Sequence, residues 1–206
     1  MQNKTRSKLR FALIGSRKLE EISAYEPFIQ IYFDYCYQLA KAGVVMSSGL
    51  CTKGPDGIAQ KAYAKAIDEG LADPTQLEVY VFDQKMINKS PLPYKEYSKV
   101  MPDSLRNTRI EFLKKVMTPS HLEACDEYAL GQHQRNVHQI LGEDLATPVD
   151  AVFTWCMLDK YKKPLGGTAT AYNLATALGI PIVNLFNTKV DDVTNTLNHL
   201  ILRGKV

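Results

Sequence analysis

The chain has 206 residues, of which 45% are apolar and 23% are charged. This size and composition fit one compact domain with a substantial core and exclude a disordered chain. The 25 basic and 22 acidic residues leave a net charge of only +3, which excludes a protein that coats nucleic acid through bulk charge, so any anion site must be local. No apolar run approaches the roughly 18 residues of a spanning helix, and the first ten residues lack the apolar core of a signal peptide. We therefore expect a cytoplasmic protein without a membrane partner.

Hydropathy and turn residues predict alternating strands and helices along most of the chain. A capping box, Ser120 with Glu123, predicts a long helix that continues to about residue 141. Strands are expected at 11–14, 44–46, 78–82, 150–155 and 181–185, and further helices at 27–43, 55–70, 104–116, 166–179 and 190–202.

This order predicts an α/β fold, a Rossmann-like three-layer sandwich with a mainly parallel sheet. We expect residues 1–206 to form a single domain with a flexible tail at 1–9. Residues 83–119 are rich in proline and weak in periodicity, which predicts an insertion, a loop or lid within the domain, ahead of the helix at 104–116. Ligand specificity is expected to lie in this insertion.

Ligands of such sheets bind at the carboxyl ends of the strands, so the turns there are the first places to inspect. The turn Gly15, Ser16 and Arg17 follows the first strand. It offers backbone N–H groups, a hydroxyl and a guanidinium to the oxygens of a phosphate. The same residues are equally typical of an ordinary turn with a solvated arginine.

The loop after the second strand is richer in glycine, which allows a ligand to approach the backbone. Its spacing is not that of a Walker A loop, because Pro55 and Asp56 stand where that motif needs Lys and Ser or Thr, and GxGxxG is absent as well. Asp56 either complements the dipole of the following helix or accepts a ribose hydroxyl. The candidate binding residues are Ser48, Gly49, Lys53, Gly54 and Asp56.

A second phosphate clamp is predicted where Gly166, Gly167 and Thr168 open a helix, although a simple helix cap explains the same residues. Arg135 and Asn136 lie in the predicted long helix. Asn136 shares the helix face of apolar residues and therefore needs a partner, either protein backbone or ligand.

The cysteines and histidines predict no metal site and no cofactor. Cys36, Cys51, Cys125 and Cys156 are far apart without a CxxC pair, which favours reduced, buried thiols. His133 and His138 are five residues apart and lack a carboxylate, and His121 and Cys125, four apart, have no further ligand in view. No Ser-His-Asp or Cys-His arrangement indicates nucleophilic catalysis.

In combination, these motifs resemble the DprA/Smf and LOG group of Rossmann-like proteins, the SLOG superfamily. The apolar strand ending in Gly15-Ser16-Arg17 is similar to the GSR start of that group. The other matching segments are Ser48-Gly49 with Gly54-Pro55-Asp56, then Arg135-Asn136, then Gly166-Gly167-Thr168, and they follow in the order of the group between residues 10 and 186.

The resemblance, which is closest to the DprA core domain, implies a phosphate-binding pocket made by these segments. DprA-like members bind single-stranded DNA and load a recombinase, LOG-like members cleave the N-glycosidic bond of nucleoside monophosphates, and others sense nucleotide signals. The expected function is therefore binding of a nucleotide or single-stranded DNA, without catalysis. The alternatives are a phosphoribohydrolase using Arg135 and Asp56, and a nucleotide sensor or sponge of the kind a phage encodes. The helix after Gly166 lacks the second glycine and the glutamate of the LOG motif, which weakens the hydrolase alternative.

A homo-oligomer, with a dimer favoured, is expected from the aromatic residues of the first long helix, which exceed what one sheet face needs. A helix with a broad buried face is the alternative. These residues are Tyr25, Phe28, Tyr32, Phe33, Tyr35 and Tyr37.

Overall fold

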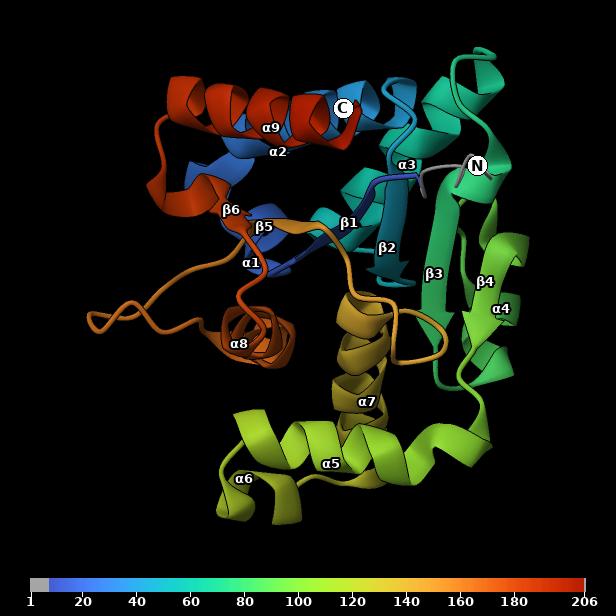
Figure 1. Cartoon of the computed structure of the whole chain (residues 1–206), viewed down its shortest axis with the longest axis vertical. Coiled ribbons are helices and arrows are strands. Elements are labelled where there is room, and N and C mark those ends of the chain that lie inside the picture. The colour runs from blue at the N-terminus through green and yellow to red at the C-terminus, as the bar shows by residue number, and fades with distance from the viewer. Residues whose placement is uncertain (1–7, 206) are drawn as a thin grey trace, which may run out of the picture.

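The computed structural model describes residues 8–205, which form an α/β sandwich around one all-parallel sheet (Figure 1). The strand order is β4-β3-β2-β1-β5-β6, which confirms the predicted fold class. Of the predicted flexible tail, residues 1–7 lie outside the described residues, whereas Leu9 packs against the core. The strands are β1 Arg10–Gly15, β2 Val45–Gly49, β3 Leu77–Val81, β4 Ser98–Val100, β5 Ala151–Trp155 and β6 Ile182–Asn184.

Helices cover both faces of the sheet, as its buried, continuously apolar strands require. Phe11 and Leu13 of β1 point into one core, while Ala12 and Ile14 point into the other, because side chains alternate along a strand. The first core is closed by α1 Lys18–Glu21, α2 Glu26–Lys41, α3 Pro55–Asp68, α4 Gln84–Lys89 and α9 Val190–Lys205, and the second by α5 Arg106–Val116, α6 Pro119–Glu123, α7 Glu127–Leu141 and α8 Ala169–Ala177.

The segment predicted as a loop or lid contributes to the framework of the domain. Within 83–119, β4 pairs in parallel with β3 and extends the sheet by one strand. This strand was missed because it is short, polar and at the edge of the sheet, where alternation of apolar residues is not required. The helix expected at 104–116 is confirmed as α5, whose Leu113 is fully buried.

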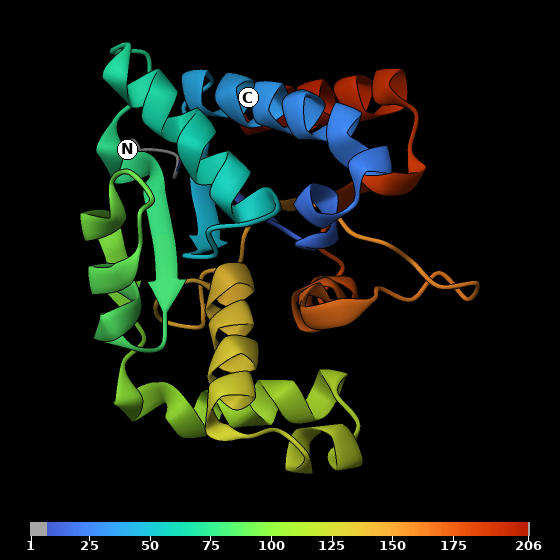
Figure 2. The same ribbon diagram turned by 180° about the vertical axis from the view of Figure 1, so that it is seen from behind.

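The predicted long helix from Ser120 to Leu141 is wrong, because two helices replace it. The first, α6, has Thr118 as its N-cap, with the hydroxyl accepting from His121 N at 3.3 Å, and Pro119 occupies the first turn. The chain then bends, and Asp126 caps the start of α7 by accepting from Ala129 N at 2.7 Å. Figure 2 shows α6 folded back beside α5, at the end of α7 that is farther from the sheet.

Most of the aromatic residues of the first long helix are used inside the chain. Tyr32 is fully buried, stacks on Phe153 at 4.7 Å and donates to its carbonyl oxygen. Tyr35 packs against the same ring and bonds to α9, and Tyr25 meets Trp155 edge to face. The broad buried face thus explains these residues, and a dimer stays a prediction.

All four cysteines are free thiols. Cys36 and Cys156 are buried as expected. Cys51 and Cys125 are only half-buried, because Cys51 lies in the loop after β2 and Cys125 in the bend after α6. Within residues 8–205, no helix combines the length and apolarity needed to cross a membrane.

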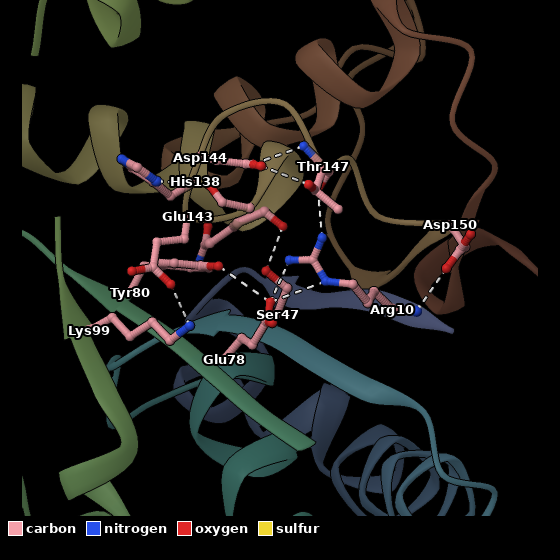
Figure 3. A network of polar contacts seen from close by, with 12 residues as sticks. Arg10, Ser47, Glu78, Tyr80, Lys99, His138, Glu143, Asp144, Thr147 and Asp150 are labelled. Atoms are coloured by element: carbon pink, nitrogen blue, oxygen red, sulfur yellow. Dashed lines mark hydrogen bonds and ion pairs between the residues drawn. The ribbon is translucent and has the colours of Figure 1, made fainter. Parts of the chain in front are cut away.

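A polar network ties the amino ends of the strands to the segment that follows α7 (Figure 3). The Arg10 side chain forms an ion pair with Glu78 of β3 and donates to Thr147 O at 2.5 Å, and the Arg10 backbone N–H donates to Asp150 Oδ2 at 2.8 Å. Nearby, the ring of His138 stacks on Tyr80 at 5.4 Å. The network lies at the amino ends of the strands, away from the loops at their carboxyl ends where a ligand is expected, so we assign it a structural role.

His138 is predicted to make stability pH-dependent. Its side chain is fully buried, with Nδ1 bonded to Gly142 O at 2.9 Å and Nε2 facing Arg109 at 3.2 Å. Burial, with Arg109 adding to it, lowers the pKa of His138 to about 4, against the opposing effect of the Gly142 carbonyl. The neutral ring therefore favours the folded state, so its contribution is complete above the ordinary pKa near 6.5 and is lost as the pH falls towards 4. The loss reaches about 3 kcal/mol.

Urea unfolding at pH 7, 6, 5 and 4 measures this loss. The variant His138→Gln should show a flatter fall in the free energy of unfolding over that range, whereas His199→Gln, which changes an exposed histidine, should match the wild type. Parallel curves for the wild type and His138→Gln would contradict the assignment.

Candidate functional site

The strand order places a topological switch point between β1 and β5. From β1 the chain passes through α2 to β2 on one side, whereas β5, on the other side of β1, is entered from α7 across the opposite face. Ligands of open α/β sheets bind outside the carboxyl ends of the two strands at such a point. The loops there contain the predicted site residues of the turn at 15–17 and the helix start at 166–168.

The turn after β1 is held by hydrogen bonds within the protein. Ser16 N donates to Trp155 O at 3.0 Å, and Gly15 N donates to Asp56 Oδ2 at 3.3 Å. The prediction that these two N–H groups are free for a phosphate is therefore wrong. Arg17 is exposed, and its side chain is what this turn offers to a ligand.

Asp56 joins the ends of β1 and β2. Its Oδ1 accepts from Gly49 N at 3.1 Å and from Gln139 Nε2 at 3.2 Å, while Oδ2 takes the Gly15 N–H. Burial raises the pKa of this carboxyl, although Arg135 and the two backbone N–H groups oppose the rise. The side chain is 5% exposed, so the ribose-acceptor interpretation is not favoured and the structural one is.

The predictions for Ser48, in β2, and for Gly54, in the loop after β2, are also wrong. The Ser48 hydroxyl is fully buried and donates to Leu13 O at 2.7 Å, so it does not face a ligand. Gly54 N donates to the Glu20 carboxylate, which takes the place predicted for a phosphate oxygen. Gly54 itself, with φ of 73°, packs on the turn after β1, since a Cβ there would lie 2.9 Å from Ser16 O. This packing leaves Lys53 exposed at the junction of the two loops.

Arg135 of α7 lies beside the carboxyl end of β2 and carries an unused donor. Its guanidinium lies against Gly49, where a Cβ would come within 2.6 Å of Cζ. Among residues 8–205, no acceptor lies within hydrogen-bonding distance of its buried Nε. Thr154, the second-last residue of β5, likewise has a buried Oγ1 without a partner among the described residues. A buried donor without an acceptor costs free energy unless a ligand or water satisfies it.

Cys51 lies within the electrostatic range of both site arginines. Burial is the main cause that raises the pKa of its thiol, with Asp56 adding to the effect, while Arg135 and Arg17 oppose it. The thiol therefore stays protonated at neutral pH, which disfavours a nucleophilic role.

The start of α8 is tied to α7 but remains open to solvent. Asn136 Nδ2 donates to Gly167 O at 2.8 Å, so its predicted partner is protein backbone. Gly166 and Gly167 are exposed, and a Cβ built on either would meet no atom within 4 Å. Thr168 is 8% exposed. The backbone at 166–168 is thus accessible at the positive end of a helix.

The loop between β5 and α8 carries a basic and aromatic tip that lies outside the predicted site residues. Leu158 and Pro164 pair across its base, and the tip projects from the domain in both views (Figures 1 and 2). Tyr161 is 70% exposed, with Lys160 Nζ 5.0 Å from its ring centre. Three lysines, at 160, 162 and 163, flank this ring, a pattern that the sequence alone displays.

An open hollow of about 490 Å³ lies elsewhere, at the carboxyl ends of β3 and β4. Phe82 and Tyr128 line it together with the acidic residues Asp83, Asp103 and Glu127. It contains none of the predicted site residues. Its carboxylates would repel a phosphate, so its size does not make it the anion site.

Comparison with protein-family models, with curated proteins and with solved structures found no match to this chain.

Proposed function

We propose that this protein is a DprA-like, non-catalytic binding protein. It binds the phosphate groups of single-stranded nucleic acid at the carboxyl ends of the strands of its sheet. The ligand chemistry is that of a nucleotide phosphate, shared by a free nucleotide and a strand. Arg17, Lys53 and Arg135 supply the positive charge, and the backbone at 166–168 supplies N–H donors.

The observation that carries this proposal is the unpartnered guanidinium of Arg135. It lies beside Gly49, at the carboxyl end of β2, where a Cβ in place of the glycine hydrogen would overlap the guanidinium. Arg135 opposes the rise in the pKa of Asp56, but the Asp56 carboxyl forms its hydrogen bonds with other donors. A phosphate oxygen would pair with this half-buried guanidinium and balance its charge.

The basic loop tip favours a strand over a free nucleotide. An exposed tyrosine between lysines is the arrangement in which bases stack and successive phosphates pair. A mononucleotide at the switch point would leave Tyr161 and its lysines, at the tip of a projecting loop, without a role.

The phosphoribohydrolase alternative is not favoured by the geometry. Asp56 accepts three hydrogen bonds from the protein and is almost fully buried. It therefore has little capacity left to stabilise charge on a ribose.

Fluorescence anisotropy with a labelled oligo(dT) at several salt concentrations tests the proposal. Arg135→Gln should raise Kd about tenfold and reduce the salt slope by about 0.7, the value for one lost phosphate contact on a single strand. Gly49→Ala should also weaken binding, because its Cβ displaces the guanidinium while leaving the charge in the chain. Tyr161→Ala should weaken binding with little change in the salt slope.

The matched control is Lys115→Gln, which removes an exposed lysine of α5. It should leave Kd within twofold of the wild type. Competition by AMP as strong as that by the oligonucleotide would replace the strand with a nucleotide as the ligand. A Kd that does not change with the salt concentration or with any of the three site substitutions would overturn the proposal.

A further inference from the structure

A cluster of two histidines and a cysteine lies between α6, α7 and α8, and contains none of the residues proposed to bind phosphate. His121 belongs to α6, Cys125 to the bend after it, and His133 to α7. Their nitrogen and sulfur ligand atoms all lie within 4.8 Å of one another. In one continuous helix, His121 and His133 would be about 18 Å apart, because twelve residues rise 1.5 Å each. The bend before Asp126 therefore brings His133 beside His121 and Cys125, and the sequence does not show this proximity.

One of the three side chains, His133, is held as metal-binding histidines commonly are. His133 Nδ1 bonds to Thr170 Oγ1 at 2.7 Å, which leaves Nε2 for an ion and fixes the ring. Thr170 is 3% exposed and so holds its position. His121 is exposed and Cys125 half-buried, so an ion can enter from solvent. The two imidazole rings stand edge to face, with centroids 5.5 Å apart.

The donor set defines the class of ion. Two imidazoles and a thiolate suit Zn²⁺ and related transition metals, whereas Mg²⁺ and Ca²⁺ need oxygen ligands. No carboxylate of the described residues belongs to the cluster, and the neighbouring Asp126 and Glu127 are used elsewhere, since Asp126 caps α7 and Glu127 pairs with Arg106. Bond lengths of about 2.1 Å to nitrogen and 2.3 Å to sulfur bring tetrahedral ligand atoms to about 3.5 Å apart. The ligand atoms must therefore move closer together when the ion binds. His121 can make most of this movement, because its side chain is exposed and its helix has only five residues.

We propose that His121, Cys125 and His133 bind one Zn²⁺ ion, with the fourth tetrahedral position left to water or an external ligand. On binding, the Cys125 thiol gives up its proton and its hydrogen bond to His121 O, and its sulfur becomes a zinc ligand. The ion would join α6 to α7 and, through Thr170, to α8. This site is independent of the phosphate-binding proposal.

Metal titration of the chelator-treated full chain tests the proposal. Zn²⁺ is added against a chromophoric competitor, and Co²⁺ is added as a spectroscopic probe. We expect one equivalent to bind, with a thiolate-to-cobalt charge-transfer band and visible bands of tetrahedral intensity. Cys125→Ser should abolish the charge-transfer band and weaken Zn²⁺ binding at least tenfold, and His133→Gln should do the same to the affinity.

The controls are Cys51→Ser, another half-buried cysteine, and His199→Gln, another exposed histidine. Both should retain the stoichiometry and the band. Circular dichroism of each metal-free variant verifies that the fold persists, and Zn²⁺ should raise the Tm of the wild type but not that of Cys125→Ser. Stoichiometric binding unchanged in both cluster variants, or no binding at micromolar Zn²⁺, would overturn the proposal.

Discussion

Replacing Asp56 with alanine is expected to lower the free energy of unfolding by about 3 kcal/mol. The substitution leaves the N–H groups of Gly15 and Gly49 and the amide of Gln139 without their acceptor. Each buried unsatisfied donor costs about 1–3 kcal/mol, and relief of the buried carboxylate offsets part of the sum. The ends of β1 and β2 would lose their shared tie.

Urea unfolding at pH 7 measures this effect, and two further variants calibrate it. Asp56→Asn retains one acceptor oxygen and should lose about half as much. Asp34→Ala removes an exposed carboxylate whose one hydrogen bond within residues 8–205 comes from Gln30 Nε2 at 2.8 Å, so it should stay within about 0.5 kcal/mol of the wild type. An equal effect of Asp56→Ala and Asp34→Ala would show that the buried carboxylate does not hold the strand ends.

Gly15→Ala is expected to destabilise the fold by about 3 kcal/mol through overpacking. The added Cβ would lie 2.4 Å from Pro55 Cγ and 2.5 Å from Trp155 O. Neither neighbour can yield easily, because Pro55 opens α3 and the Trp155 carbonyl accepts the Ser16 N–H. The strain therefore separates β1 from β5 or from α3.

The matched control is Gly167→Ala, whose Cβ meets no atom within 4 Å. Its midpoint in urea should lie close to that of the wild type, and its oligonucleotide binding reports whether the open backbone at 166–168 needs a glycine. Should Gly15→Ala unfold at the wild-type midpoint, the close packing of the strand ends would be refuted.

The sequence already contains the signals for most of the fold. Buried parallel strands are continuous apolar runs, and prolines and glycines mark where the helices begin and end, so local rules suffice for β1, β2, β3 and β5. The polar edge strand at Ser98–Val100 has no such signal, because its pairing with β3 decides its conformation.

The candidate site shows the same division. Arg17 and Lys53 are exposed at strand-end loops, as the motif positions predict. The glycine N–H groups looked free because the sequence shows donors but not the acceptors that reach them. Asp56 and Glu20 take those donors only after folding brings their helices to the loops.

By itself, the sequence determined the α/β class and the parallel sheet, because these follow from local periodicity and from the alternation of strands and helices. Only the tertiary structure decided which donors are already satisfied and which, like Arg135 Nε, are not. It also decided that a bend before Asp126 brings His133 beside His121 and Cys125. Hydrogen bonds and ligand sets depend on distances between segments far apart in the chain, and those distances exist only once both cores have packed.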